Sequence, residues 1–180
     1  AFEDAKITPN NRALKYGDSV FETLKLVNGK LIFWEAHYFR LMASMRMLRM
    51  KIPMSFTLEF LENEILKTAK VTNSNNNLRI RLTITRKDGG FYLPLTNEVD
   101  YLIEYQEINF VNKSIYKVDL YKDFYVYSGH LSTIKTNNKI IHTIASIYAR
   151  ENELDNCILL NERKGVVEAT NASLFLVKGL

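Results

Sequence analysis

The sequence predicts an α+β fold arranged in two domains, and three patterns carry this prediction. Asn28-Gly29 separates two segments of alternating apolar residues, which is typical of a tight β-hairpin turn. Apolar residues then recur at three- and four-residue spacing over residues 35–50 and 56–69, which indicates two amphipathic helices. A polar stretch at residues 111–114 precedes a second series of short strand-like segments, and we take this stretch as the linker.

The first predicted domain, residues 1–110, mixes strands and helices. The last two of its strands are rich in β-branched and aromatic residues and are joined by a loop around Gly89-Gly90. In chain order we expect the end of a strand and a turn at 1–9, a hairpin of strands 19–27 and 30–34, helices 35–50 and 56–69, a polar run at 72–77, and strands 78–85 and 101–110.

The second predicted domain, residues 115–180, contains one helix among short strands. The helix is expected over residues 138–152, because Ile140, Ile144 and Tyr148 recur on one face. The predicted strands are 115–121, 124–127, 157–160, 166–169 and 173–177.

Composition excludes several classes of function. With 180 residues and 47% hydrophobic residues, the chain is able to build a packed core. Its apolar stretches are shorter than the roughly 20 residues of a membrane span, so we expect a cytoplasmic protein with no membrane partner. A single cysteine and three histidines give neither an internal disulfide nor a metal-ligand cluster. The net charge of +4 is spread among charges of both signs and matches no nucleic-acid-binding motif.

Lys135 and Glu168 are candidates for chemistry. Lys135 is expected to open the helix that follows it, where unpaired N–H groups and partial burial lower the pKa of an amine, as a Schiff-base lysine requires. The alternative is an ordinary solvated lysine. Glu168 lies in an apolar strand, where an inward carboxylate needs a partner such as a cationic heterocycle.

His37 and Arg40 form a second candidate group on the first predicted helix. Their three-residue spacing places both side chains on one helix face. They form either a surface pair or a site in which the arginine binds a phosphate group with two hydrogen bonds.

Five segments, in order, resemble the motifs of the class IV (fold type IV) pyridoxal-phosphate-dependent aminotransferases. Lys135 and Glu168 are separated as in that family. The segments are residues 16–23 (YGDSVFET), 37–41 (HYFRL), 85–90 (TRKDGG), 134–138 (IKTNN) and 167–175 (VEATNASLF).

The resemblance implies a fold, a cofactor and a set of site residues. The fold would combine an N-terminal α/β sandwich-like domain with a C-terminal pseudo-barrel domain, and the enzyme would be a homodimer. Lys135 would form a Schiff base with pyridoxal 5'-phosphate. The other implied site residues are Arg40 on the phosphate, Glu168 on the ring nitrogen, Thr170 as a further cofactor contact, and Phe21, His37 and Arg86 in the substrate pocket.

Departures from the family pattern leave the reaction open. Arg86-Lys87-Asp88 stands where D-amino-acid transaminases have an Arg-x-His pair, and Lys139 replaces a tyrosine of many branched-chain transaminases. Phe21-Glu22 is nearer the transaminase pattern. The leading hypothesis is a branched-chain-like transamination of an amino acid to a 2-oxo acid. The alternatives are a 4-amino-4-deoxychorismate lyase, which releases pyruvate and 4-aminobenzoate, and more remotely a non-catalytic cofactor-binding or nucleic-acid-binding protein.

The resemblance also predicts that the second domain is truncated. Family members continue well beyond position 180, so we expect an open second domain with unpaired strands. We also expect these residues alone neither to bind the cofactor tightly nor to turn over substrate.

Overall fold

The computed structural model describes residues 7–70, 77–108 and 113–179. The chain divides into two compact units: the first comprises residues 1–110 with Lys135–Asn137, and the second comprises 111–134 with 138–180. Because residues 109–112 lie outside the described part, the predicted domain boundary and most of the linker stay predictions. The same holds for most of the predicted opening segment 1–9 and polar run 72–77.

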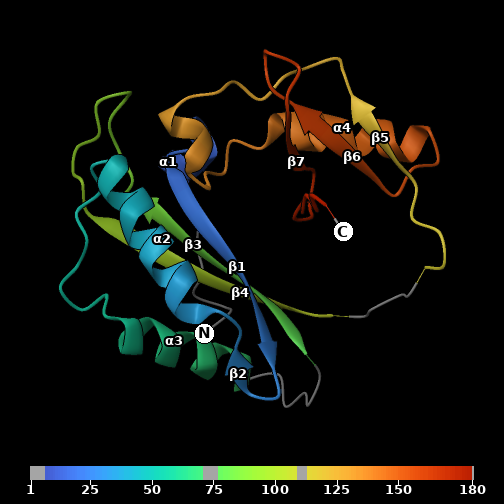
Figure 1. Cartoon of the computed structure of the whole chain (residues 1–180). Coiled ribbons are helices and arrows are strands. Elements are labelled where there is room, and N and C mark those ends of the chain that lie inside the picture. The colour runs from blue at the N-terminus through green and yellow to red at the C-terminus, as the bar shows by residue number, and fades with distance from the viewer. Residues whose placement is uncertain (1–6, 71–76, 109–112, 180) are drawn as a thin grey trace. The chain divides into compact units, whose positions relative to one another are not determined.

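The first unit contains a four-stranded antiparallel sheet of strand order β2-β1-β3-β4 (Figure 1). Its strands are β1 (Ser19–Val27), β2 (Lys30–Leu31), β3 (Leu78–Arg86) and β4 (Val99–Glu107). The predicted hairpin is confirmed, and Asn28 and Gly29 have φ of 48° and 76°, as a type I′ turn requires. The return strand is shorter than the predicted 30–34, because helix α2 begins at Trp34.

Three helices complete the first unit: α1 (Arg12–Tyr16), α2 (Trp34–Met47) and α3 (Leu58–Lys70). α2 and α3 confirm the two predicted helices with small shifts at their ends. Figure 1 shows α2 running along the sheet. The helices cover one face of the sheet, on which alternate residues of β1 and β3 lie. These alternate residues are buried, and the core on this face includes Leu24, Ile80, Leu82, Leu41, Met45, Leu61 and Ile65.

A segment from beyond the predicted linker also joins this sheet. Thr136 forms a β-bridge with Val20, and the Phe21 N–H donates to the Lys135 carbonyl at 2.9 Å. The expectation that Lys135 opens a helix is wrong, because its backbone pairs with β1 instead. Helix α4 begins only at Ile140.

The second unit contains a three-stranded sheet of strand order β5-β6-β7 packed against α4 (Figure 1). β6 lies parallel to β5 and antiparallel to β7. Its elements are β5 (Val118–Tyr121), the short 3-10 helix η2 (His130–Thr133), α4 (Ile140–Glu151), β6 (Asn156–Leu160) and β7 (Val166–Ala169). The buried cluster is small and comprises Tyr121, Ala145, Ala149, Cys157 and Leu159.

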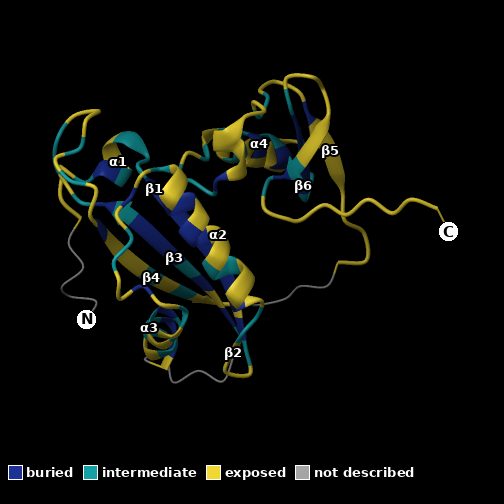
Figure 2. Cartoon of the chain, turned by 60° about the vertical axis from the view of Figure 1, so that its left-hand side comes forward, coloured by how far each residue is buried: buried dark blue, intermediate teal, exposed yellow. Residues whose placement is uncertain are grey.

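Two predicted strands of this unit are wrong. Residues 124–127 form no strand, although the Val126 N–H donates to the Leu160 carbonyl at 2.8 Å. Residues 173–177 are also irregular and exposed, as Figure 2 shows for the segment leading to the C-terminus. Apolar alternation alone does not make a strand, because a neighbouring strand must also supply a ladder of hydrogen bonds. Neither segment has such a partner strand among the described residues. No helix in the described part of the chain is long and apolar enough to cross a membrane.

Candidate functional site

Lys135 lies on the sheet face of the first unit that is opposite α2 and α3. Directly opposed residues of antiparallel segments point to one face, so Lys135 and Phe21 are side by side, with Lys135 Nζ 5.0 Å from the ring centroid. Arg81 from β3 stacks on the same ring, with its Cζ 3.6 Å from the centroid. Arg81 Nη2 also donates to Asn137 Oδ1 at 2.9 Å. The structure therefore brings the predicted residues Lys135 and Phe21 together.

Arg81 is a site residue that the sequence patterns did not single out. Burial lowers the pKa of its guanidinium, partly offset by Glu104 at 3.9 Å. An arginine nevertheless stays charged in proteins. Its hydrogen bond to Asn137, two residues after the lysine, ties the lysine segment to β3. Strand alternation would have assigned Arg81 to this face. It lies near the lysine segment only because residues 135–137 pair with β1.

Glu22 organises a second group on the helix-covered face. Its side chain is 1% exposed and accepts from Arg40 Nε at 2.7 Å and Arg40 Nη2 at 2.5 Å. His37 Nδ1 lies 2.7 Å from the same carboxylate, which confirms that His37 and Arg40 share one helix face. The hydrogen bond to Glu22 raises the pKa of Arg40. Arg40 is half-exposed and carries five N–H donors, so the fork to Glu22 leaves donors for an anion.

Arg86, predicted in the substrate pocket, is buried and held by protein groups. It donates to Asp18 at 2.9 Å, to Asn97 at 2.5 Å and to the Leu48 carbonyl at 2.7 Å. Arg12 Nε donates to the same Asp18 oxygen at 2.8 Å. A substrate carboxylate would have to displace these acceptors. The pocket role of Arg86 stays a prediction, whereas its anchoring contacts are a structural fact.

Arg12 extends this network into the following loop. Its Nη1 donates to the carbonyls of Gly89 at 3.0 Å and Phe91 at 2.6 Å. The loop backbone is thereby fixed while the side chains of Phe91, Tyr92, Leu93 and Leu95 remain exposed.

In the second unit, Glu168 and Thr170 are each held by a neighbour. His142 Nε2 of α4 lies 3.0 Å from Glu168 Oε1, so an imidazole is one partner of the predicted inward carboxylate. Thr170 bonds through its N–H and its hydroxyl to Oδ1 of the buried Asn156. His142 and Asn156 had no distinguishing sequence signal, because a histidine on a helix and an asparagine before a strand are both ordinary.

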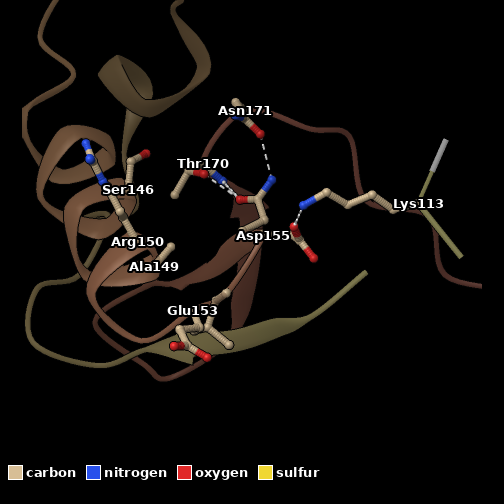
Figure 3. Close-up of a pocket in the computed structure, with 10 residues that line it drawn as sticks. Lys113, Ser146, Ala149, Arg150, Glu153, Asp155, Thr170 and Asn171 are labelled. Atoms are coloured by element: carbon tan, nitrogen blue, oxygen red, sulfur yellow. Dashed lines mark hydrogen bonds and ion pairs between the residues drawn. The ribbon is translucent and has the colours of Figure 1, made fainter. Parts of the chain in front are cut away.

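A pocket of about 430 Å³ lies in the second unit, and Thr170 and Asn171 form part of its wall (Figure 3). Its charged lining residues are two cations and two anions, and Lys113 forms an ion pair with Asp155 across it. The charges are Lys113, Arg150, Glu153 and Asp155. Because they offset one another, the pocket has no net preference for a charged ligand.

Comparison with known proteins places this fold among aminotransferases. The family model described as amino-transferase class IV matches residues 19–180. A protein of Methanocaldococcus jannaschii named as a branched-chain-amino-acid aminotransferase is 28% identical over 98% of this chain and 62% of its own length. The chain therefore belongs to the class IV aminotransferase family.

Solved structures share the fold. A protein of Legionella pneumophila named as a 4-amino-4-deoxychorismate lyase matches with a TM-score of 0.81 at 17% identity, over 92% of this chain and 60% of the other. A hypothetical aminotransferase from Mycobacterium tuberculosis in its PLP-bound form matches with a TM-score of 0.70 at 19% identity, over 92% of this chain and 60% of the other. This mixed α and β architecture is that of the fold type IV enzymes, and the family depends on pyridoxal phosphate. The chain spans about three fifths of the length of these relatives.

Proposed function

We propose that the protein is a pyridoxal-phosphate-dependent aminotransferase that converts a branched-chain-like amino acid to its 2-oxo acid. The observation that carries the proposal is the placement of Lys135. Its backbone is hydrogen-bonded to β1, and its amine lies 5.0 Å from the ring centroid of Phe21, on which the partly buried Arg81 also stacks. A solvated surface lysine needs neither restraint.

The residues present suit this cofactor chemically. Arg40 is half-exposed and keeps N–H donors beyond the two bound to Glu22, which suits a phosphate, and Glu168 is a carboxylate, which suits a protonated ring nitrogen. Thr170, two residues after Glu168 in the sequence, adds a hydroxyl group. When bound, pyridoxal phosphate supplies an electron-withdrawing ring that weakens the bonds at the α-carbon of an amino acid.

Each of these residues has a distinct proposed task. Lys135 would hold the cofactor through Nζ and, once the incoming amino group has displaced it, would move the α-proton as general base and then general acid. Glu168 would keep the ring nitrogen protonated, and Arg40 would donate charge-assisted hydrogen bonds to the phosphate. Phe21, which lies beside Lys135, contributes to the amino-acid pocket, and Arg86 supports it by anchoring Asp18 and the loop after β3. His37 lies with Arg40 on the helix-covered face, where it contacts Glu22.

A lyase acting on 4-amino-4-deoxychorismate is the second candidate. It is favoured by the fold match to a protein of that name and by Lys139, which replaces the tyrosine of many branched-chain transaminases and resembles the basic residue of such lyases. Incubation with aminodeoxychorismate, and separately with leucine plus 2-oxoglutarate, distinguishes the two. Release of pyruvate in the first reaction, with no glutamate in the second, would exclude the transaminase.

We also propose that the protein pairs with a second copy of itself. The support is the exposed apolar loop, in which Phe91 and Tyr92 are 85% and 90% exposed although Arg12 fixes their backbone. A fixed loop that presents large apolar side chains to solvent is typical of an interface.

The covalent role of Lys135 is tested by trapping. Borohydride reduction of the full-length protein with pyridoxal phosphate should label Lys135, because the reduced linkage survives digestion and peptide mapping. Lys135→Arg should abolish the label and lower activity by at least about a thousandfold, as expected for loss of a reacting side chain. Label on Lys139 or Lys164 instead, with none on Lys135, would refute the assignment.

A further inference from the structure

We propose that His142 is a positioning residue that orients the carboxylate of Glu168 toward the cofactor ring. This inference rests on the proposed function, because it gives Glu168 the role of partner to the ring nitrogen. It concerns two side chains of the second unit that no sequence motif connects.

The contact joins two different elements. His142 lies in α4 and Glu168 in β7, and their side-chain atoms Nε2 and Oε1 are 3.0 Å apart. In the β6–β7 register Glu168 lies opposite Leu159, which is fully buried in the cluster beneath α4. Directly opposed residues share a sheet face, so Glu168 belongs to the face that α4 covers. The bond is therefore an interaction across the helix–sheet layer.

Glu168 needs such a restraint if its direction is to be fixed. β7 has four residues and lies at the edge of its sheet, with β6 as its one neighbouring strand among the described elements. The Glu168 side chain is 40% exposed, and a glutamate so exposed samples several rotamers. His142 is 15% exposed and sits on a helix that packs on β5 and β6, so it provides a fixed reference point.

The contact with His142 uses only part of the hydrogen-bond acceptor capacity of the Glu168 carboxylate. A carboxylate has two oxygens with about four acceptor positions, so a bond to Oε1 does not exhaust it. Fixing Oε1 restricts the rotation of the group and so limits the directions that Oε2 can take. Asn156 acts on the same stretch of chain, because it holds the N–H and hydroxyl of Thr170 two residues later. The end of β7 is thus restrained on both sides of Ala169.

The experiment compares His142→Leu and His142→Gln in the full-length protein. Leucine removes the ring nitrogen, whereas the glutamine amide places a donor near the position of Nε2. The matched control is His130→Leu, which removes an exposed histidine from the same unit. In cofactor-free protein, Glu168→Gln should shift the ring nitrogen resonances of His142 and leave those of His130 unchanged.

In protein loaded with pyridoxal phosphate, His142→Leu should alter the absorption spectrum of the bound cofactor. It should also lower kcat about tenfold with little change in KM, the size of loss seen when a partner that orients a metal ligand is removed. His142→Gln should recover most of both, and His130→Leu should match the wild type. A purely structural role would not produce recovery together with a spectral change.

Two failures are distinguishable. If the wild-type protein takes up no cofactor, the proposed function fails and this inference falls with it. If the wild type takes up cofactor and His142→Leu leaves both the spectrum and kcat unchanged, the inference alone is overturned.

Discussion

The two units are stabilised by different kinds of buried polar group. In the described part of the first unit, Arg12, Glu22 and Arg86 are charged and almost fully buried. In the described part of the second unit, the buried polar residue is the uncharged Asn156. The first unit thus holds its loops by ion pairs across its elements, whereas the second holds its strand end by neutral hydrogen bonds.

This difference has consequences for mutation. Removing one partner of a buried ion pair leaves a charge without compensation, which is strongly destabilising. Removing a neutral hydrogen-bonding side chain costs less. Each unit has its own probe: the single tryptophan, Trp34, is buried in the first unit, and the single cysteine, Cys157, is buried in the second.

Arg86→Leu should show the largest effect. It should lower the free energy of unfolding by about 3 kcal/mol, the low end for a broken buried ion pair, because Arg12 still pairs with Asp18. Urea titration followed by Trp34 fluorescence measures this. Arg79→Leu, an exposed arginine on the same strand, is the control and should change stability little. Equal losses in the two variants would contradict the comparison.

Asn156→Ala should have a smaller effect, confined to the second unit. The variant removes the acceptor that the Cys157 N–H and the Thr170 N–H share, although the Thr170 N–H keeps the Cys157 carbonyl at 3.1 Å. This loss costs about 1–3 kcal/mol. The readout is the rate at which a thiol reagent modifies Cys157. Burial raises the pKa of this thiol and blocks access, so modification reports opening of the unit.

The control for this second variant is Asn152→Ala. Asn152 is exposed, and its side-chain amide donates to the Tyr148 carbonyl at 2.9 Å. Labelling of Cys157 should accelerate much more in Asn156→Ala than in Asn152→Ala. A large response of Trp34 fluorescence to Asn156→Ala would show that the two units do not unfold separately.

Local patterns predicted most of the fold. The local sequence was enough to predict four elements, because their residues follow the strand or helix period and their turns have suitable residues. These elements are β1, α2, α3 and β7. Residues 124–127 and 173–177 have strand-like composition but form no strand. Pairing depends on where a distant backbone edge lies, and that information is not local.

The site was predictable only in its motif residues. Lys135, Arg40 and Glu168 were singled out through the family resemblance and through the environments their spacing implied. Their neighbours Arg81 and His142 were missed, because their contacts span long stretches of chain. The Arg81–Asn137 bond joins residues 56 positions apart, and the His142–Glu168 contact joins residues 26 positions apart. The helix expected at Lys135 does not form for the same reason, because residues 135–137 pair with the distant strand β1.

The smallest expected effect comes from an exposed ion pair of the first unit, Lys67 with Glu64 at 2.6 Å. The bond to Lys67, assisted by Tyr101, lowers the pKa of Glu64 below its ordinary value of 4.5. A carboxyl with a lowered pKa stabilises the folded state fully above the ordinary value, and this contribution is lost as the pH falls through the lowered value. Lys67→Ala should therefore reduce stability by at most about 0.5 kcal/mol near neutral pH, because solvent screens the pair. Trp34 fluorescence should show the difference from wild type shrinking as the pH falls through the lowered pKa. Lys70→Ala, on the same last turn of α3, is the control. If Lys67→Ala lowered the free energy of unfolding as much as Arg86→Leu does, burial would not explain the difference in stability between the two ion pairs.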